Sequence, residues 1–214
     1  STPLEDGALS IEAADEVLIL ADIRLLKEEG VSAFDEIAAY LDDLTKDYDA
    51  LLEAHARIHG GLFNRVKLEL GGGSDHLKSS EELLELSTWE DINTALLEKQ
   101  FDAGRYNIIC ATGNMPPNLQ GVWGGTYVPD WASDYTHNGN VPSAIAANLA
   151  GNMPELTLAY TSYIESLIPD LELNAKHFFG ARGVVLPSST STHGDNNAFA
   201  KDFAGGKWVA GAGW

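Results

Sequence analysis

Aromatic and amide side chains are concentrated between residues 117 and 140. Two amide side chains, Asn138 and Asn140, lie two positions apart near the end of this segment. Aromatic residues recur every four positions before them, at Trp123, Tyr127, Trp131 and Tyr135. Aromatic faces pack against the C–H face of a sugar, and amides bond its hydroxyl groups. The segment therefore predicts a site for a neutral, polyhydroxylated ligand, although a structural loop pinned by buried tryptophans would have a similar composition.

The same spacing on a continuous helix would indicate a core stripe. Gly124, Gly125 and Pro129 interrupt the segment and disfavour such a helix. We therefore expect a long loop that displays its aromatic side chains, a common location for binding residues.

Helices are expected to support this loop. Apolar residues repeat at helical spacing over Tyr48–Val66, and Gly71–Ser74 then indicates a loop. A further helix is predicted from Ser87 or Thr88 to about Asn114, and another over Pro142–Leu149. A third begins in the Asn152–Glu155 region and runs to about Phe178, with Gly180 or Gly183 ending it. The last is predicted from Lys207 onward. Two short strands are predicted earlier, over Ala8–Glu12 and Glu16–Asp22.

Composition narrows the function classes. The net charge of −19 argues against nucleic acid or an anionic membrane surface as a partner. The single cysteine, Cys110, excludes an intramolecular disulfide and a Cys-based zinc site. His55 and His59 are four residues apart, but no third ligand lies nearby in sequence, so we expect no metal.

Several sequence blocks together resemble glycoside hydrolase family 95, which includes α-L-fucosidases and α-L-galactosidases. These blocks are Phe101-Asp-Ala-Gly-Arg-Tyr106, Pro117-Asn-Leu-Gln-Gly-Val-Trp123, Pro129-Asp-Trp131 and Asp134-Tyr-Thr-His-Asn-Gly-Asn140. The resemblance covers most of the chain but only a middle slice of a family enzyme. It implies a mainly α fold, part of an (α/α)6 barrel, preceded by a helical linker and the last strands of a β-sandwich. The expected parts are residues 1–30 (sandwich), 31–87 (linker) and 88–214 (barrel).

The resemblance also implies an inverting exo-glycosidase for terminal α-linked sugars. Asn138 and Asn140 would position and activate the attacking water, while the general-acid Glu and the activating Asp are expected beyond residue 214. The substrate contacts would be Asn118, Trp123, Trp131, Tyr135, His137, His193 and Asp195. No cofactor is expected.

The expected partners are an oligosaccharide or polysaccharide and the remainder of the protein's own chain or a companion segment. The sequence itself leaves the location open, and the resemblance favours a periplasmic or extracellular one. A non-catalytic carbohydrate-binding protein on the same scaffold is the alternative. The sugar and its linkage stay open, because Val141–Ala147 lacks the aromatic and acidic residues that the family commonly has there.

Overall fold

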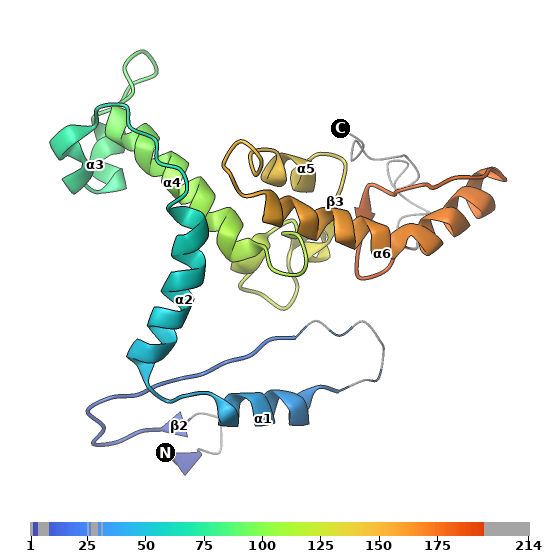
Figure 1. Ribbon diagram of the computed structural model, residues 1–214, viewed down its shortest axis with the longest axis horizontal. Coiled ribbons are helices and arrows are strands. Elements are labelled where there is room, and N and C mark those ends of the chain that lie inside the picture. Colours follow the sequence, from blue (N-terminus) through green and yellow to red (C-terminus); the bar gives the residue numbers. More distant parts are fainter. Residues whose placement is uncertain (1, 4–8, 25, 27–29, 31, 195–214) are drawn as a thin grey trace. The chain divides into compact units, whose positions relative to one another are not determined.

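Helices form most of the chain described by the computed structural model, which covers residues 2–3, 9–24, 26, 30 and 32–194 (Figure 1). The helices are α1 (Phe34–Asp43), α2 (Tyr48–Phe63), α3 (Ser80–Glu85), α4 (Thr94–Ala111), α5 (Asn140–Ile145) and α6 (Pro154–Phe179). Short 3₁₀ helices cover Gly73–Leu77, Gly121–Trp123 and Asp130–Ser133. The expectation of a mainly helical chain is confirmed. In the described residues, no helix has the length and apolar character needed to cross a membrane.

Two antiparallel pairs of two-residue strands complete the described structure. Strand β1 (Thr2–Pro3) pairs with β2 (Leu9–Ser10), and β3 (Tyr135–Thr136) pairs with β4 (Ser189–Thr190). The strand predicted over Glu16–Asp22 is wrong: these residues have no regular structure. Two of its apolar side chains, Val17 and Ile19, are 51% and 82% exposed, so the alternation there reflects no buried sheet face.

The chain divides into two compact units, Ser1–Arg57 and Ile58–Trp214. In the first unit, none of the side chains whose burial is described is buried. The second unit contains the three buried apolar clusters found among the described residues. This boundary differs from the expected divisions at residues 30 and 87, and the three-part organisation stays a prediction.

Helix α6 supplies the largest cluster. Tyr160, Tyr163, Leu167 and Leu171 follow one another at three- and four-residue spacing, so they share one helix face, and all are at most 7% exposed. Val141 of α5 and Leu186 pack against them. The predicted bounds of α6 are confirmed: Pro154 occupies the first turn and Gly180 ends the helix in the left-handed conformation, with φ 62°.

Helix α4 begins later than predicted. The Ser87 hydroxyl donates to the Leu83 carbonyl (2.8 Å) and accepts from the Asn93 N–H (3.1 Å), while the Thr88 hydroxyl accepts from the Asp91 N–H (3.1 Å). These bonds close a turn where a helix start was predicted. Asn93 is the true N-cap, since its side chain accepts from the Ala95 N–H at 2.9 Å.

Arg105 fastens α4 to its neighbours. Its buried guanidinium donates to the carbonyls of Leu62 and Phe63, the last residues of α2, and to that of Val66, which follows the helix. It also donates to the carbonyl of Gly151, shortly before α6. One side chain thus satisfies carbonyls from two separate segments of the chain. Helix α5 is shorter than the predicted Pro142–Leu149 and gives way to turns after Ile145, while the helix predicted from Lys207 lies outside the described residues.

Candidate functional site

A small polar pocket lies where the aromatic loop, the start of α5 and strand β4 meet. Its volume is about 290 Å³, and its lining consists of Leu119, Trp131, Thr136, Asn138, Asn140, Ser188 and Ser189. We call it the amide pocket, after Asn138 and Asn140. Three of the residues proposed from sequence, Trp131 and the two asparagines, are therefore brought together.

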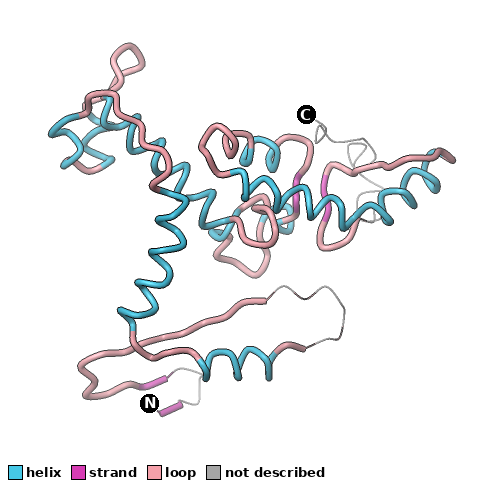
Figure 2. The backbone as a smooth tube through the Cα atoms, viewed as in Figure 1, coloured by secondary structure: helices cyan, strands magenta, loops and turns pink. Residues whose placement is uncertain are grey.

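The β3–β4 pair sets the orientation of its wall. Tyr135 pairs with Thr190 and Thr136 pairs with Ser189, and the His137 N–H extends the ladder by donating to the Ser188 carbonyl at 2.6 Å. Figure 2 shows the two strands side by side, although more than 50 residues separate them in sequence. Successive side chains on an extended strand point to opposite faces. Within β3, Tyr135 accordingly faces the interior and Thr136 lines the pocket. In the turn that follows β3, His137 is buried in the interior and Asn138 lines the pocket.

His137 is fully buried behind this wall. Its Nδ1 lies 3.1 Å from the Tyr160 hydroxyl and its Nε2 lies 2.7 Å from the Thr190 hydroxyl. Burial lowers the pKa of the imidazole to about 4, which keeps it neutral at physiological pH. His137, predicted as a substrate contact, is 0% exposed, has both ring nitrogens bonded within the protein and does not line the pocket.

The aromatic side chains of the loop divide into three groups. Trp131 is 64% exposed and lines the pocket. Trp123 is also exposed but lies outside the lining. Tyr135 is half-buried, with its ring centroid 4.6 Å from that of Tyr163, so it packs against the core. Among the predicted aromatic contacts, only Trp131 is in place for a ligand in this pocket.

Hydrogen bonds across its base hold the loop. The Asn118 amide donates to the Ser133 carbonyl (3.0 Å), the Gln120 amide donates to the Asp130 carbonyl (2.6 Å), and the Leu119 N–H donates to the Asp134 carbonyl (2.9 Å). Asn118, predicted as a substrate contact, thus uses its donor within the loop.

The loop backbone is strained beside the pocket. Trp131, Ala132 and Ser133 have φ values of 56°, 54° and 50°, in the left-handed region that side chains disfavour. Each such residue costs on the order of 1 kcal/mol. The bonds across the loop base hold this conformation, which presents Trp131 at the pocket.

The remaining predicted contacts lie on the segment after β4. His193 is exposed and does not line the pocket, and Asp195 lies outside the described residues. The pocket residues that sequence reasoning missed are Leu119, Thr136, Ser188 and Ser189. Thr136 directly precedes the predicted contact His137, but β3 is too short for its alternation to be read from sequence. Ser188 and Ser189 gave no signal, because a two-residue strand carries no readable periodicity.

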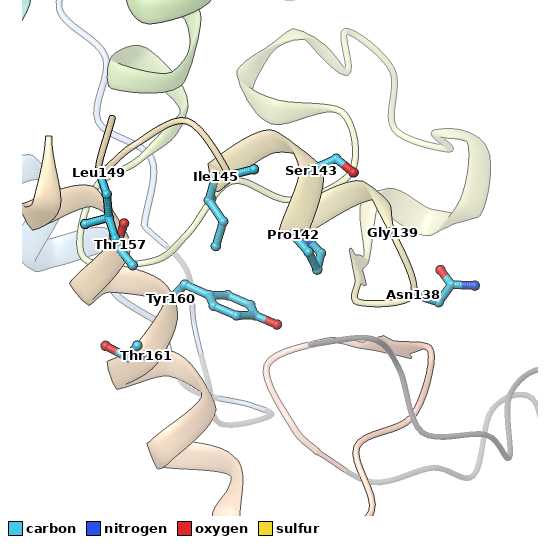
Figure 3. Close-up of a pocket in the computed structure, with 10 residues that line it drawn as sticks. Asn138, Gly139, Pro142, Ser143, Ile145, Leu149, Thr157, Tyr160 and Thr161 are labelled. Atoms are coloured by element: carbon cyan, nitrogen blue, oxygen red, sulfur yellow. The ribbon is translucent and has the colours of Figure 1, made fainter. Parts of the chain in front are cut away.

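A second, larger pocket of about 630 Å³ lies between α5 and α6 (Figure 3). Pro142, Ile145, Leu149 and Tyr160 give it a mostly apolar lining. Asn138 stands at its edge, and Figure 3 shows the amide pointing away from Tyr160. Convergent polar groups are therefore concentrated in the amide pocket.

The amide pocket offers polar side chains but no acid among the described residues that line it. Its described lining contains amides, hydroxyls and an indole, but no carboxylate. Within the described part of the chain, no three His, Cys, Asp or Glu side chains are grouped closely enough to hold a metal ion. Such a site can orient a neutral ligand and a water molecule, whereas proton transfer requires a group from elsewhere.

Comparison with known proteins points to one family. Residues 47–214 match the model of the glycosyl hydrolase family 95 catalytic domain. The chain is 33% identical over 157 residues to "Probable alpha-fucosidase A" of Aspergillus niger, an alignment that covers 70% of this chain and 19% of that protein. It is 28% identical over 181 residues to "Alpha-L-fucosidase 2" of Arabidopsis thaliana, covering 78% of this chain and 21% of that protein. The chain spans about a fifth of the length of these curated relatives.

Proposed function

The chain belongs to glycosyl hydrolase family 95, and on that premise we propose that the full protein hydrolyses terminal α-linked sugars, α-L-fucosides first among them. The observation that carries the proposal is the amide pocket. Two asparagines, two serines and a threonine surround it, with Trp131 at its side. This is the mixture of an aromatic face and neutral polar groups that a sugar requires.

Inversion is the proposed stereochemical course. In an inverting glycosidase, one carboxylic acid protonates the leaving oxygen while water attacks the opposite face of the sugar. We assign Asn138 and Asn140 to holding that water. An amide is not a base near neutral pH, so a carboxylate from elsewhere in the protein is needed to accept the proton. The general acid is likewise assigned to residues outside this chain.

The fold proposed around the site is an (α/α)6 barrel that contains residues 88–214. Residues 31–87 would form a helical linker, and residues 1–30 the last strands of a β-sandwich. The family match over residues 47–214 and the mainly helical structure support the helical catalytic domain.

The decisive experiment uses the full natural protein that contains these residues. We expect it to release sugar from an aryl α-L-fucoside faster than from an aryl α-L-galactoside, and proton NMR of the first product should show inversion. Asn140→Ala should lower kcat by at least about 100-fold while leaving KM nearly unchanged. Asn107→Ala provides the matched control, because Asn107 is exposed on α4. A near-normal kcat for Asn140→Ala would refute the assigned role.

A second candidate function is carbohydrate binding without hydrolysis, which is favoured by the lack of a carboxylate in the described lining. It predicts saturable binding of α-L-fucosides by the full protein with no release of product. Product release at any rate that Asn140→Ala abolishes would exclude it.

A further inference from the structure

A chain of hydrogen bonds runs through the wall behind the amide pocket. It joins the Tyr160 hydroxyl, the His137 ring, the Thr190 hydroxyl and the Tyr163 hydroxyl, and it ends at the Ser191 carbonyl. The separations are 3.1, 2.7, 2.5 and 2.5 Å in that order. The four side chains are between 0% and 7% exposed, so water does not compete for the bonds among them.

The far end of the chain sets its direction. The Ser191 carbonyl can only accept, so the single hydrogen of the Tyr163 hydroxyl is used there. Tyr163 consequently accepts from Thr190. With its own hydrogen given to Tyr163, the Thr190 hydroxyl must accept from His137.

The same reasoning determines the protonation of the ring. Nε2 carries the hydrogen that is donated to Thr190, and in a neutral imidazole Nδ1 is then the acceptor. The Tyr160 hydroxyl supplies the matching donor to Nδ1. Each hydroxyl and each ring nitrogen in the chain therefore has an assigned direction for every bond it makes.

His137 lies between two residues that line the pocket. Thr136 precedes it and Asn138 follows it. Its N–H is held by the Ser188 carbonyl, and its ring is held by α6 on one side and β4 on the other. His137 directly follows β3 and begins the turn that leads into α5. A ring fixed at both nitrogens holds the backbone of this turn, and with it the directions of the neighbouring Thr136 and Asn138.

We propose that His137 is a positioning residue: through the directional chain from Tyr160 to Ser191, it holds the Asn138 and Asn140 segment in place at the pocket. The contribution of His137 to hydrolysis rests on the proposed function, whereas the hydrogen-bond chain does not depend on it. The hydrogen-bond chain and its effect on hydrolysis are therefore tested separately.

The first test reads the ring directly. Nitrogen NMR of the full protein labelled at histidine should show His137, identified by its loss in His137→Gln, as a neutral ring with hydrogen on Nε2 at pH 7. In Tyr160→Phe the Nδ1 resonance should move, because its donor is gone. Hydrogen on Nδ1, or a ring that titrates like a free histidine, would overturn the proposal. Neither outcome depends on turnover, so a protein without hydrolase activity would refute only the proposed function.

The second test reads catalysis. His137→Leu removes both bonds at similar volume and should lower kcat about tenfold or more, with KM changed less than about threefold. His137→Gln retains a donor and an acceptor and should recover part of the loss. Tyr160→Phe removes one bond without changing His137 and keeps the test valid if His137→Leu does not fold. The control is Tyr48→Phe, an exposed tyrosine in the first unit. A kcat within twofold of the wild type for both His137→Leu and Tyr160→Phe would overturn the positioning role.

Discussion

The two sides of the amide pocket are built differently. On one side, β3, β4 and α6 form a wall whose interior side chains are buried and bonded to one another. On the other side, the loop over residues 118–134 is held mainly by bonds to its own backbone, and its aromatic side chains are exposed. The wall should therefore govern stability and the loop should govern ligand contact. Substitutions on the two sides test that division.

The largest effect on stability is expected from the core beneath the wall. Leu171 is 1% exposed in the main cluster, and Leu171→Ala should lower the free energy of unfolding by about 2–5 kcal/mol because it leaves a cavity. Denaturant unfolding measures this. Leu173→Ala changes the same residue type on the same helix at 46% exposure, and a loss as large there would contradict the assignment of the core face.

The next largest effect on stability is expected from acid, which protonates His137 in the wall. The pKa of His137 is lowered to about 4 in the folded protein from 6.5, so the unfolded state binds more protons between these values. The contribution of His137 to the free energy of unfolding is then fully present above about pH 6.5. It falls by roughly 3 kcal/mol as the pH drops to about 4. Tyr160 and Tyr163 face the ring from α6, and burial raises the pKa of both, to about 12 for Tyr160, so they stay neutral throughout. Unfolding measured against pH should show a shallower slope in His137→Gln, and equal slopes would refute the prediction.

A smaller loss is expected at the end of the hydrogen-bond chain. Tyr163→Phe removes the hydroxyl that accepts from Thr190 and donates to the Ser191 carbonyl. The buried Thr190 hydroxyl then keeps its bond to His137 but loses its acceptor, which should cost about 1–3 kcal/mol in unfolding free energy. Tyr127→Phe, at a fully exposed position on the loop, should leave the unfolding midpoint unchanged.

The loop should show the reverse pattern. Trp131→Ala should change the unfolding free energy by less than about 0.5 kcal/mol, because the indole is 64% exposed. Binding of a fucoside should weaken by about 1 kcal/mol, roughly fivefold, from the loss of the stacking face. Calorimetric titration of the full protein measures this. Unchanged affinity would remove Trp131 from the site.

Sequence patterns predicted the elements whose signals are local. Pro154 and Gly180 mark the two ends of α6, and the glycines and proline of the aromatic segment correctly indicated a loop. The start of α4 was misplaced because side-chain bonds from Ser87 and Thr88 close a turn that resembles a helix start in sequence. The burial of His137 was missed because it depends on β4, a two-residue strand more than 50 positions away. Contacts of that range leave no trace in local composition.

The fixed direction of the hydrogen bonds behind the pocket also has an evolutionary consequence. Since each hydroxyl has one hydrogen and one assigned partner, residues 137, 160, 163 and 190 cannot be exchanged independently. An apolar residue at 137 removes the need for a hydroxyl at 160 and leaves one at 190 without its donor. Residue 191 takes part in this chain only through its carbonyl, so the chain places no demand on the side chain there. The four positions 137, 160, 163 and 190 should accordingly change together among relatives of this chain.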